Sequence, residues 1–366
     1  MGPDYASRLR RAGEATGRSS LDALVITPSA DLRYLAGYEP PPLERLTALV
    51  IRPGADPVLV VPQLEAPRAG DSPAGSMVQF LTWKDGEDPY GAVAGLLSGA
   101  SEVGVSDAMP ALHLLGFQHE LPTVSFSGAA TVVSTLRVRK DAGEVDALAR
   151  AGDADDEAFR HIIAERLEGR AEEDVARSLR GHIVAAGHDE ALFWIVGSGP
   201  NGASPHHEPA GRTLREGEPV VLDFGGRAGG YCSDMTRTVS LGEPADAEVR
   251  EVHAIVAEAQ GAAFRAVKPG VPAEDVDRAA RAVIEAAGYG DAFIHRTGHG
   301  IGLDEHEEPY IVRGNTVALE EGMCFSIEPG IYLAGRFGVR IEDIVVVTRD
   351  GARSLNDAPR ELALVS

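Results

Sequence analysis

The chain has 366 residues, enough for two domains, and its 44% hydrophobic and 25% charged residues are ordinary for a soluble globular protein. Its 56 acidic and 34 basic residues give a formal net charge of −22, which disfavours nucleic acid and anionic membranes as partners. Two cysteines outside any CxxC motif, no secretory signal pattern and no apolar run of ~20 residues predict a cytoplasmic protein.

The first third of the sequence alternates short β-branched runs with helical segments, which predicts an α/β domain over residues 1–130. Helices are expected at 4–17 and near 88–98. The expected strands are 24–27, 48–52, 57–62, 103–105 and 123–126.

Residues 131–366 should form a second domain of α+β type. A helix is expected over 140–167, with Asp141 as its N-cap and Glu144 three residues later, and a second helix should end at Gly187. Strands should follow at 191–197, 219–224 and 231–241. A second cycle has helices at 245–267 and 273–287 and strands at 323–327, 330–333 and 339–348. Two helices followed by a small antiparallel sheet therefore occur twice, and a pseudo-two-fold arrangement would join the two halves around one cavity.

Each half places a pair of carboxylates inside apolar segments: Asp223, Asp234, Glu328 and Glu342. A carboxylate buried without a partner costs several kcal/mol, so four of them together predict a bound cation. The alternative is a salt-bridged core. Its counter-ions would be Arg237, Arg336 and Arg340.

Three histidines, His295, His299 and His306, lie within twelve residues. The first two are four apart, as in helical zinc motifs, but alternating glycines disfavour a helix here and indicate an extended backbone that passes close to another segment. One imidazole with four carboxylates is an oxygen-rich set. It suits Mn²⁺, Co²⁺ or Fe²⁺ in a two-metal site better than a cysteine-based structural zinc.

In these residues the chain resembles the pita-bread metallopeptidase family, which includes methionine aminopeptidase, aminopeptidase P and prolidase. The resemblance covers essentially the whole chain and is strongest from residue 140 to 348. It favours the proline-specific branch, because residues 1–130 resemble that branch's creatinase-type N-terminal domain. It implies two divalent metal ions, most simply Mn²⁺, with Co²⁺, Fe²⁺ or Zn²⁺ as alternatives. Their ligands would be Asp223, Asp234, His299, Glu328 and Glu342.

The resemblance also implies roles for these and neighbouring side chains. Asp223 would bind one metal through both oxygens, and Asp234 and Glu342 would bridge the two. A metal-bridging hydroxide would attack the peptide bond. Glu328 would carry the proton, and His306 would stabilise the tetrahedral intermediate.

Four further residues match the family around the substrate. His206, from the loop pair His206-His207, would contact the scissile region; one histidine of this pair is expected to be an ordinary surface residue. His295, Tyr332 and Arg340 would line the leaving-group pocket or brace the metal site.

The implied function is hydrolysis of the Xaa-Pro bond, by a dipeptidase or an aminopeptidase, in a homodimer or larger homo-oligomer that takes proline-containing peptides. Two alternatives remain open from the sequence. One is a metal-dependent aminopeptidase or C–N hydrolase of other specificity, and the other is a pita-bread binding module without catalysis.

Overall fold

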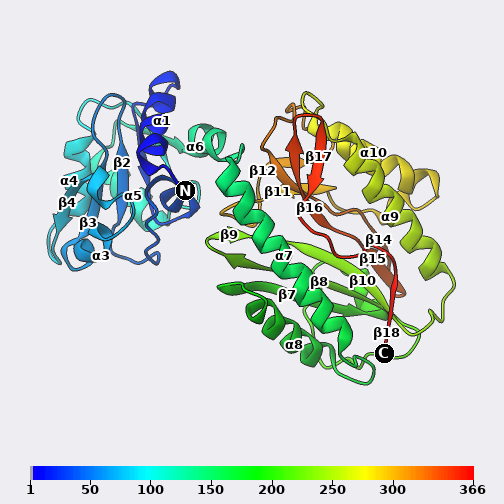
Figure 1. Cartoon of the computed structure of the whole chain (residues 1–366). Coiled ribbons are helices and arrows are strands. Elements are labelled where there is room, and N and C mark those ends of the chain that lie inside the picture. Colours follow the sequence, from blue (N-terminus) through cyan, green and yellow to red (C-terminus); the bar gives the residue numbers. More distant parts are fainter. Residues whose placement is uncertain (1–2) are drawn as a thin grey trace. The chain divides into compact units, whose positions relative to one another are not determined.

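The computed structural model describes residues 3–366, and the chain forms two compact units that divide between Arg137 and Val138 (Figure 1). The sequence places the boundary near residue 130. Helix α6 (Ala130–Arg137) lies between these positions and packs on α1 (Tyr5–Arg18), so it belongs to the first unit.

The N-terminal unit is built on a six-stranded mixed sheet with the order β4-β3-β2-β1-β5-β6. Its β1–β2 and β2–β3 pairs are antiparallel, and the other pairs are parallel. The strands are β1 (Ala23–Ile26), β2 (Ala48–Ile51), β3 (Val58–Pro62), β4 (Gln79–Trp83), β5 (Glu102–Val105) and β6 (Ser125–Gly128). The central strands β1 to β3 are buried along their whole length, as their β-branched composition predicts.

The expected helices of this unit correspond to α1, which begins after the N-cap Asp4, and to α4 (Pro89–Leu96), which begins after the N-cap Asp88. The sequence prediction missed strand β4, which lies at an edge of the sheet and is largely exposed. It also missed three helices besides α6: α2 (Ala30–Ala36), α3 (Ala66–Gly70) and α5 (Ala111–Glu120). Short helices carry little periodic signal, so these were the hardest elements to recognise.

The C-terminal unit repeats one order of elements. Helices α7 (Ala142–Ala164) and α8 (Glu172–Ala185) pack on the first sheet, and α9 (Glu248–Ala266) and α10 (Ala273–Ala286) pack on strands of the second half (Figure 1). Each half has its own hydrophobic core. The predicted repeat of two helices and a sheet is thus present. The predicted start of α7 is confirmed, because Asp141 and Glu144 form a capping box.

The strands of the first half form a sheet of order β18-β10-β8-β7, with β9 paired to β8. Those of the second half form a sheet of order β12-β11-β13-β16-β17 and a separate β14–β15 hairpin. The first set is β7 (Glu190–Ser198), β8 (Pro219–Ala228), β9 (Tyr231–Cys232), β10 (Met235–Leu241) and β18 (Ala363–Val365). The second is β11 (Gly298–Gly300), β12 (Glu307–Ile311), β13 (Cys324–Ile327), β14 (Gly330–Leu333), β15 (Phe337–Arg340), β16 (Asp343–Thr348) and β17 (Gly351–Ser354).

Two strands that the sequence predicts as continuous are broken, and each break holds an acidic residue. The segment 231–241 divides into β9 and β10 around Asp234, and the segment 339–348 divides into β15 and β16 around Glu342. At the second break the chain changes partners, because β15 pairs with β14 whereas β16 pairs with β13. Between them the N–H of Glu342 donates to the carbonyl of Thr236, 3.0 Å away, so this residue joins the two halves.

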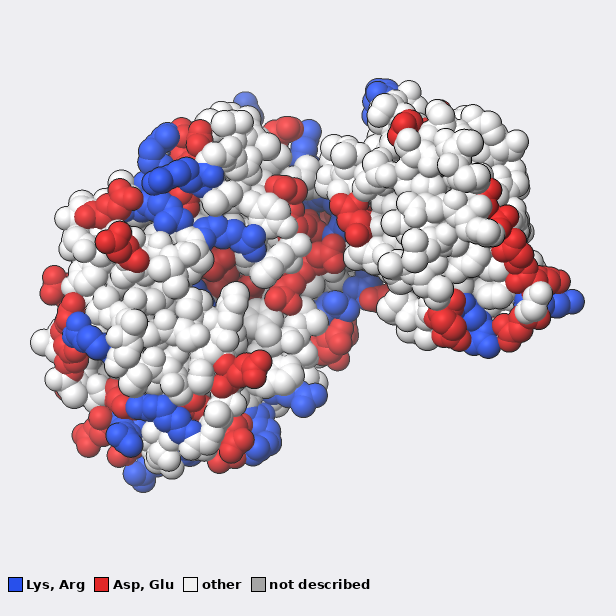
Figure 2. Space-filling view, turned by 180° about the vertical axis from the view of Figure 1, so that it is seen from behind, with Lys and Arg blue, Asp and Glu red and all other residues white. Residues whose placement is uncertain are grey.

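Figure 2 shows acidic and basic side chains interspersed over the larger unit on the face drawn, whereas on the smaller unit they lie mainly along its edges. Cys232 and Cys324 are both buried and free. Within residues 3–366, no helix is both long and apolar enough to cross a bilayer.

Candidate metal and peptidase site

The four acidic residues meet in the C-terminal unit, one of them within a strand and the other three where strands end or break. Asp223 lies within β8, opposite Thr236 of β10 and Ile195 of β7. Asp234 and Glu342 occupy the strand breaks, and Glu328 lies between β13 and β14. Because these positions come from both halves, the cluster forms only when the two halves fold against each other.

The acidic residues line one cavity of about 450 Å³. The expected histidines His206, His295, His299 and His306 and the expected Arg340 line it too. Five further residues complete the wall: Phe193, Ile195, Pro205, Arg296 and Glu305. The structure thus brings the expected ligand and substrate residues together around one space, with Tyr332 buried next to Arg340.

Asp234 and Glu342 are 4% and 2% exposed, and one oxygen of each, Oδ1 and Oε1, has no hydrogen-bond partner among the described residues. Burial raises the pKa of both carboxyls, and the negative charges of the neighbouring carboxylates raise it further. The pKa of Glu328 is raised mainly by burial as well. Negatively charged carboxylates that share one cavity repel one another. A divalent cation bound between them would remove this electrostatic cost.

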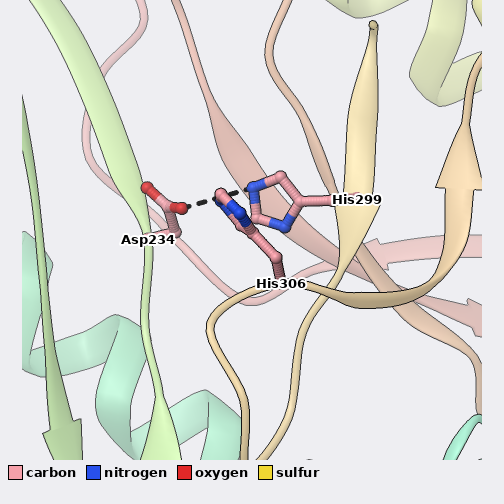
Figure 3. Close-up of side chains that lie close together, drawn as sticks. All are labelled: Asp234, His299 and His306. Atoms are coloured by element: carbon pink, nitrogen blue, oxygen red, sulfur yellow. Dashed lines mark ion pairs between the residues drawn. The ribbon is translucent and has the colours of Figure 1, made fainter. Parts of the chain in front are cut away.

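One ring nitrogen of His299 faces Asp234 (Figure 3). Its Nδ1 donates to the carbonyl of Gly300 at 3.1 Å, which leaves the lone pair on Nε2. This Nε2 lies 3.5 Å from Asp234 Oδ2 and 3.5 Å from Glu328 Oε1. Burial lowers the pKa of His299, so its neutral form is favoured and the lone pair faces acceptor oxygens. Ligand atoms about 2.1 Å from one ion lie roughly 3–3.5 Å apart, so the spacing suits a shared cation.

The glycines on either side of His299 let its strand pass close to neighbouring backbone. A Cβ on Gly298 would lie 1.9 Å from the Ser326 carbonyl oxygen, and one on Gly300 would lie 2.2 Å from that of Glu308. Both distances are impossible for a real side chain. The expectation of an extended segment that approaches another chain segment is confirmed, and the helical alternative does not occur.

Asp223 is held differently from the other three carboxylates. Arg340 donates to its Oδ2 in a buried ion pair, and the hydroxyl of Thr236 lies 3.0 Å from its Oδ1 and 2.7 Å from Glu342 Oε2. Arg340 also donates to the Tyr332 hydroxyl at 2.8 Å. The guanidinium therefore orients one carboxylate and braces the wall of the cavity.

The counter-ions proposed for a salt-bridged core lie mostly elsewhere. Arg237 pairs with Asp343, and Arg336 pairs at the surface with Asp246 and Glu248. Among the described arginines, Arg340 alone forms an ion pair with any of the four acidic residues, and it reaches only Asp223. The geometry therefore supports a cation site over a salt-bridged core.

The remaining histidines divide into residues of the cavity and residues outside it. The His306 ring lies beside that of His299, with ring centroids 4.0 Å apart and ring planes tilted by 59°, and Figure 3 shows both rings directed toward Asp234. Burial lowers the pKa of His306 to about 4, with a smaller effect from His299. His206 lines the cavity, whereas the Nε2 of His207 bonds to Glu172 Oε2 at 2.8 Å.

His295 and Tyr332 form a pair beside the acidic cluster. The Nε2 of His295 lies 2.8 Å from the Tyr332 hydroxyl, and its Nδ1 donates to the carbonyl of Arg296 at 2.7 Å. Burial lowers the pKa of His295 to about 4 and raises that of Tyr332 to about 12. Both side chains are therefore neutral near pH 7 and act through hydrogen bonds.

Three overlapping groups of side chains could each hold an ion, because the ligand atoms within each group lie within 4.8 Å of one another. The first is Asp223, Asp234 and Glu342; the second is His299, Glu328 and Glu342; the third is Asp234, His299 and His306. The first two contain the five expected ligands and share Glu342. The third adds His306, which the sequence assigns to catalysis.

Several residues of the cavity escaped the sequence analysis. Phe193 and Ile195 alternate along β7, where Ile195 pairs with Asp223, so period-two alternation was an available signal. Thr236, two residues after Asp234, carries a hydroxyl between two of the carboxylates. Arg296 stands just before a glycine-flanked histidine, and only the fold shows that it reaches the cavity.

Comparison with known proteins agrees with this geometry. The profile of "Metallopeptidase family M24" matches residues 146–349, and that of "Creatinase/Prolidase N-terminal domain" matches residues 8–139. A probable dipeptidase PepE of Mycobacterium tuberculosis is 50% identical over 364 residues, which cover 99% of this chain and 96% of that protein. An Xaa-Pro dipeptidase of Lactobacillus helveticus is 37% identical, with 95% and 96% covered. The structure of a prolidase from Thermococcus sibiricus superposes with a TM-score of 0.93 at 38% identity and covers all of both chains.

Proposed function

Because the chain belongs to metallopeptidase family M24, with a creatinase/prolidase N-terminal domain and the pita-bread catalytic fold, we propose that it hydrolyses Xaa-Pro dipeptides in a dinuclear metal site. The proposed metal ligands are Asp223, Asp234, His299, Glu328 and Glu342.

One observation carries the metal assignment. Asp234 Oδ1, Glu342 Oε1 and the Nε2 lone pair of His299 are acceptors in a buried cluster without matching donors among the described residues. Such groups are costly unless a cation binds them. When bound, divalent ions act as Lewis acids and lower the pKa of water, which supplies a nucleophile near neutral pH. The oxygen-rich donor set favours Mn²⁺, with Co²⁺, Fe²⁺ and Zn²⁺ as alternatives.

The positions of Glu328 and His306 suit the roles proposed for them. The Glu328 side chain lines the cavity and is 14% exposed, so its carboxyl can accept and release a proton beside the substrate. His306 is exposed toward the cavity and neutral near pH 7, so its ring N–H can donate to the oxygen that becomes negative during attack. His206 completes the wall on the substrate side, and Arg340 orients Asp223.

The proposed proline specificity is supported by the names of two relatives and by the apolar part of the wall, which includes Phe193, Ile195 and Pro205. The test is an assay with added Mn²⁺ on Ala-Pro, Leu-Pro, Ala-Pro-Ala and the proline-free Ala-Leu. We expect turnover of the Xaa-Pro dipeptides, loss of activity with a chelator, and little cleavage of Ala-Leu. Metal-loaded protein that cleaves none of the proline substrates would overturn the assignment.

Each alternative has its own outcome in the same experiments. Efficient cleavage of Ala-Leu would indicate an aminopeptidase of other specificity, whereas a binding module would contain no metal. Elemental analysis should find about two equivalents per chain, because the ligand set can hold two ions. We also propose a homodimer, which light scattering of the purified protein would test.

A further inference from the structure

The two adjacent histidines in the connection between β7 and β8 have different surroundings. His206 lines the catalytic cavity, but its ring forms no hydrogen bond or ion pair with the other residues that the structure describes. His207 is instead held by a buried acid, because its Nε2 lies 2.8 Å from Oε2 of Glu172. The position of the His206 ring therefore depends on the backbone of the loop that carries it.

Glu172 is the first residue of α8, and its side chain is completely buried. A buried carboxylate is tolerated only where donors surround it, and here all the donors come from one loop. Oε1 accepts from the N–H of Ser198 at 2.8 Å, from its hydroxyl at 2.7 Å and from the Asn201 amide at 3.2 Å. Oε2 accepts from the same amide at 3.0 Å and from His207. Both oxygens are thus paired with donors.

These donors span the loop from one end to the other. Ser198 is the last residue of β7, and His207 directly follows the histidine of the cavity wall. Burial raises the pKa of Glu172, but the hydrogen bonds from the loop lower it by more, so the pKa lies below its ordinary value. The carboxylate is therefore ionised near pH 7, and its hydrogen bonds are of the strong, charge-assisted kind. One buried charge ties both ends of the loop to α8.

On its cavity side the same loop lies against the second half of the C-terminal unit. Two terminal nitrogens of Arg340 lie 3.4 and 3.5 Å from the carbonyl oxygen of Pro205. A Cβ on Gly338 of β15 would lie 2.0 Å from the carbonyl oxygen of Gly202, so the two backbones are in close contact. The loop therefore fits between α8 and β15, and a change at its attachment to α8 would displace His206 relative to the metal cluster.

We propose that Glu172 is a positioning residue of the peptidase site: by holding Asn201 and His207, it fixes the loop so that His206 meets the scissile bond. This inference rests on the proposed Xaa-Pro hydrolase function and on the substrate contact proposed for His206. It adds a residue that does not line the cavity and acts only through the loop. A buried acid without metal or substrate contact thereby becomes part of the catalytic apparatus.

The test is a double-mutant cycle on Ala-Pro with Mn²⁺-loaded enzyme. Glu172→Gln keeps the shape of the side chain but removes its charge and places an NH₂ group among donors. It should lower kcat per metal-loaded site by about 10–100-fold with KM within about twofold, because small displacements of a catalytic group are costly. His206→Ala should lose a similar factor. In the double variant, Glu172→Gln should cost no more than about twofold further. The exposed neighbour supplies the matched control, and Glu173→Gln should behave like wild type.

A second measurement needs no substrate. Hydrogen exchange of the backbone amides of residues 198–207 should be about tenfold faster in Glu172→Gln than in wild type or Glu173→Gln. If Glu172→Gln does not fold, His207→Phe removes a donor from the loop side and should show the same pattern to a smaller extent. Unchanged exchange, or a full loss of kcat from Glu172→Gln on the His206→Ala background, would overturn the inference. Faster exchange in a protein whose wild type cleaves no Xaa-Pro peptide would support the loop attachment and refute the proposed function instead.

Discussion

Two buried arginine–aspartate pairs cross between the halves of the C-terminal unit, and their surroundings differ. Arg340 of the second half pairs with Asp223 in the cavity, and Arg237 of the first half pairs with Asp343 behind it. Around Asp343 both oxygens have donors: Oδ1 accepts from Arg237 at 2.7 Å, and Oδ2 accepts from Gln260 at 2.9 Å and from Arg360 at 2.5 Å. Beside Asp223, by contrast, neighbouring carboxylates keep oxygens without donors among the described residues.

This contrast separates a structural buried acid from a candidate metal ligand. Asp343 and Glu342 are adjacent in sequence and both are buried, so neither position nor exposure distinguishes them. The hydrogen-bond donors around each carboxylate distinguish the two residues. A carboxylate whose oxygens are all paired with donors strengthens the fold, whereas one with an orphan oxygen beside other acids leaves room for a cation.

The largest effect is expected in the cavity. Asp234→Asn should reduce activity to background and lower the metal content, because it removes a ligand shared by two of the candidate metal groups. The same change should make the metal-free protein more stable, on the order of 1 kcal/mol, because it removes a buried charge among like charges. Activity, elemental analysis and urea unfolding with chelator give the three readouts. If the metal-free variant were markedly less stable than metal-free wild type, Asp234 would be a structural acid like Asp343, and the contrast between the two regions would be wrong.

The corresponding change at Asp343 should alter the stability of the protein in the opposite direction. Asp343→Asn leaves Arg237 buried without its ionic partner and should destabilise the protein by roughly 3–5 kcal/mol with or without metal. Metal affinity of the folded variant should be close to wild type. Urea unfolding of both forms measures the loss, and a loss below about 1 kcal/mol would be at odds with a structural role.

A smaller effect on activity is expected from His306. His306→Ala should keep its metal and lose about 10²–10³-fold in kcat, the usual cost of removing one donor to a developing negative charge. His306→Gln retains an N–H donor and should recover part of the rate. Loss of metal from the alanine variant would instead support the third candidate group, in which His306 is a ligand.

The smallest effect concerns pH and the region behind the cavity. Burial lowers the pKa of His253 from 6.5 to about 4, with a smaller effect from the positive charge of Arg237. The unfolded chain therefore binds a proton that the folded protein does not, and stability should fall as pH drops from 6.5 toward 4. His253→Gln should flatten this dependence by on the order of 2 kcal/mol between pH 7 and 4.5. Urea unfolding with chelator at both pH values measures it, and parallel curves for variant and wild type would exclude the explanation.

The ligand candidates were accessible from sequence because a carboxylate inside an apolar strand is a local conflict that a reader can see. The repeat of two helices and a sheet was accessible for a similar reason, since helical periodicity and the capping residues Asp141 and Glu144 are local patterns. Asp223 shows the limit of this approach. Its position in a strand was predictable from the residues, whereas its partner Arg340, 117 residues later, appeared there as one of three available counter-ions, and only the family resemblance placed it near the metal site.

What the sequence could not show depends on contacts between distant segments. The strand breaks at Asp234 and Glu342 arise where the chain exchanges one pairing partner for another, and residues near the break do not encode that exchange. Arg237 was considered as a counter-ion of the acidic cluster, but the fold pairs it with Asp343. Arg296 has no local mark at all, because only the fold places it in the cavity wall and over the ring of Tyr310, fourteen residues later.

The hydrogen bonds around Tyr332 run in one direction. Arg340 can only donate, so the hydroxyl accepts from it and directs its own proton to Nε2 of His295, whose Nδ1–H then donates to the carbonyl of Arg296. The two nitrogens of His295 are therefore chemically distinct in the folded protein. Their ¹⁵N resonances would give a spectroscopic probe inside the cavity, one that reports on metal loading without any turnover of substrate.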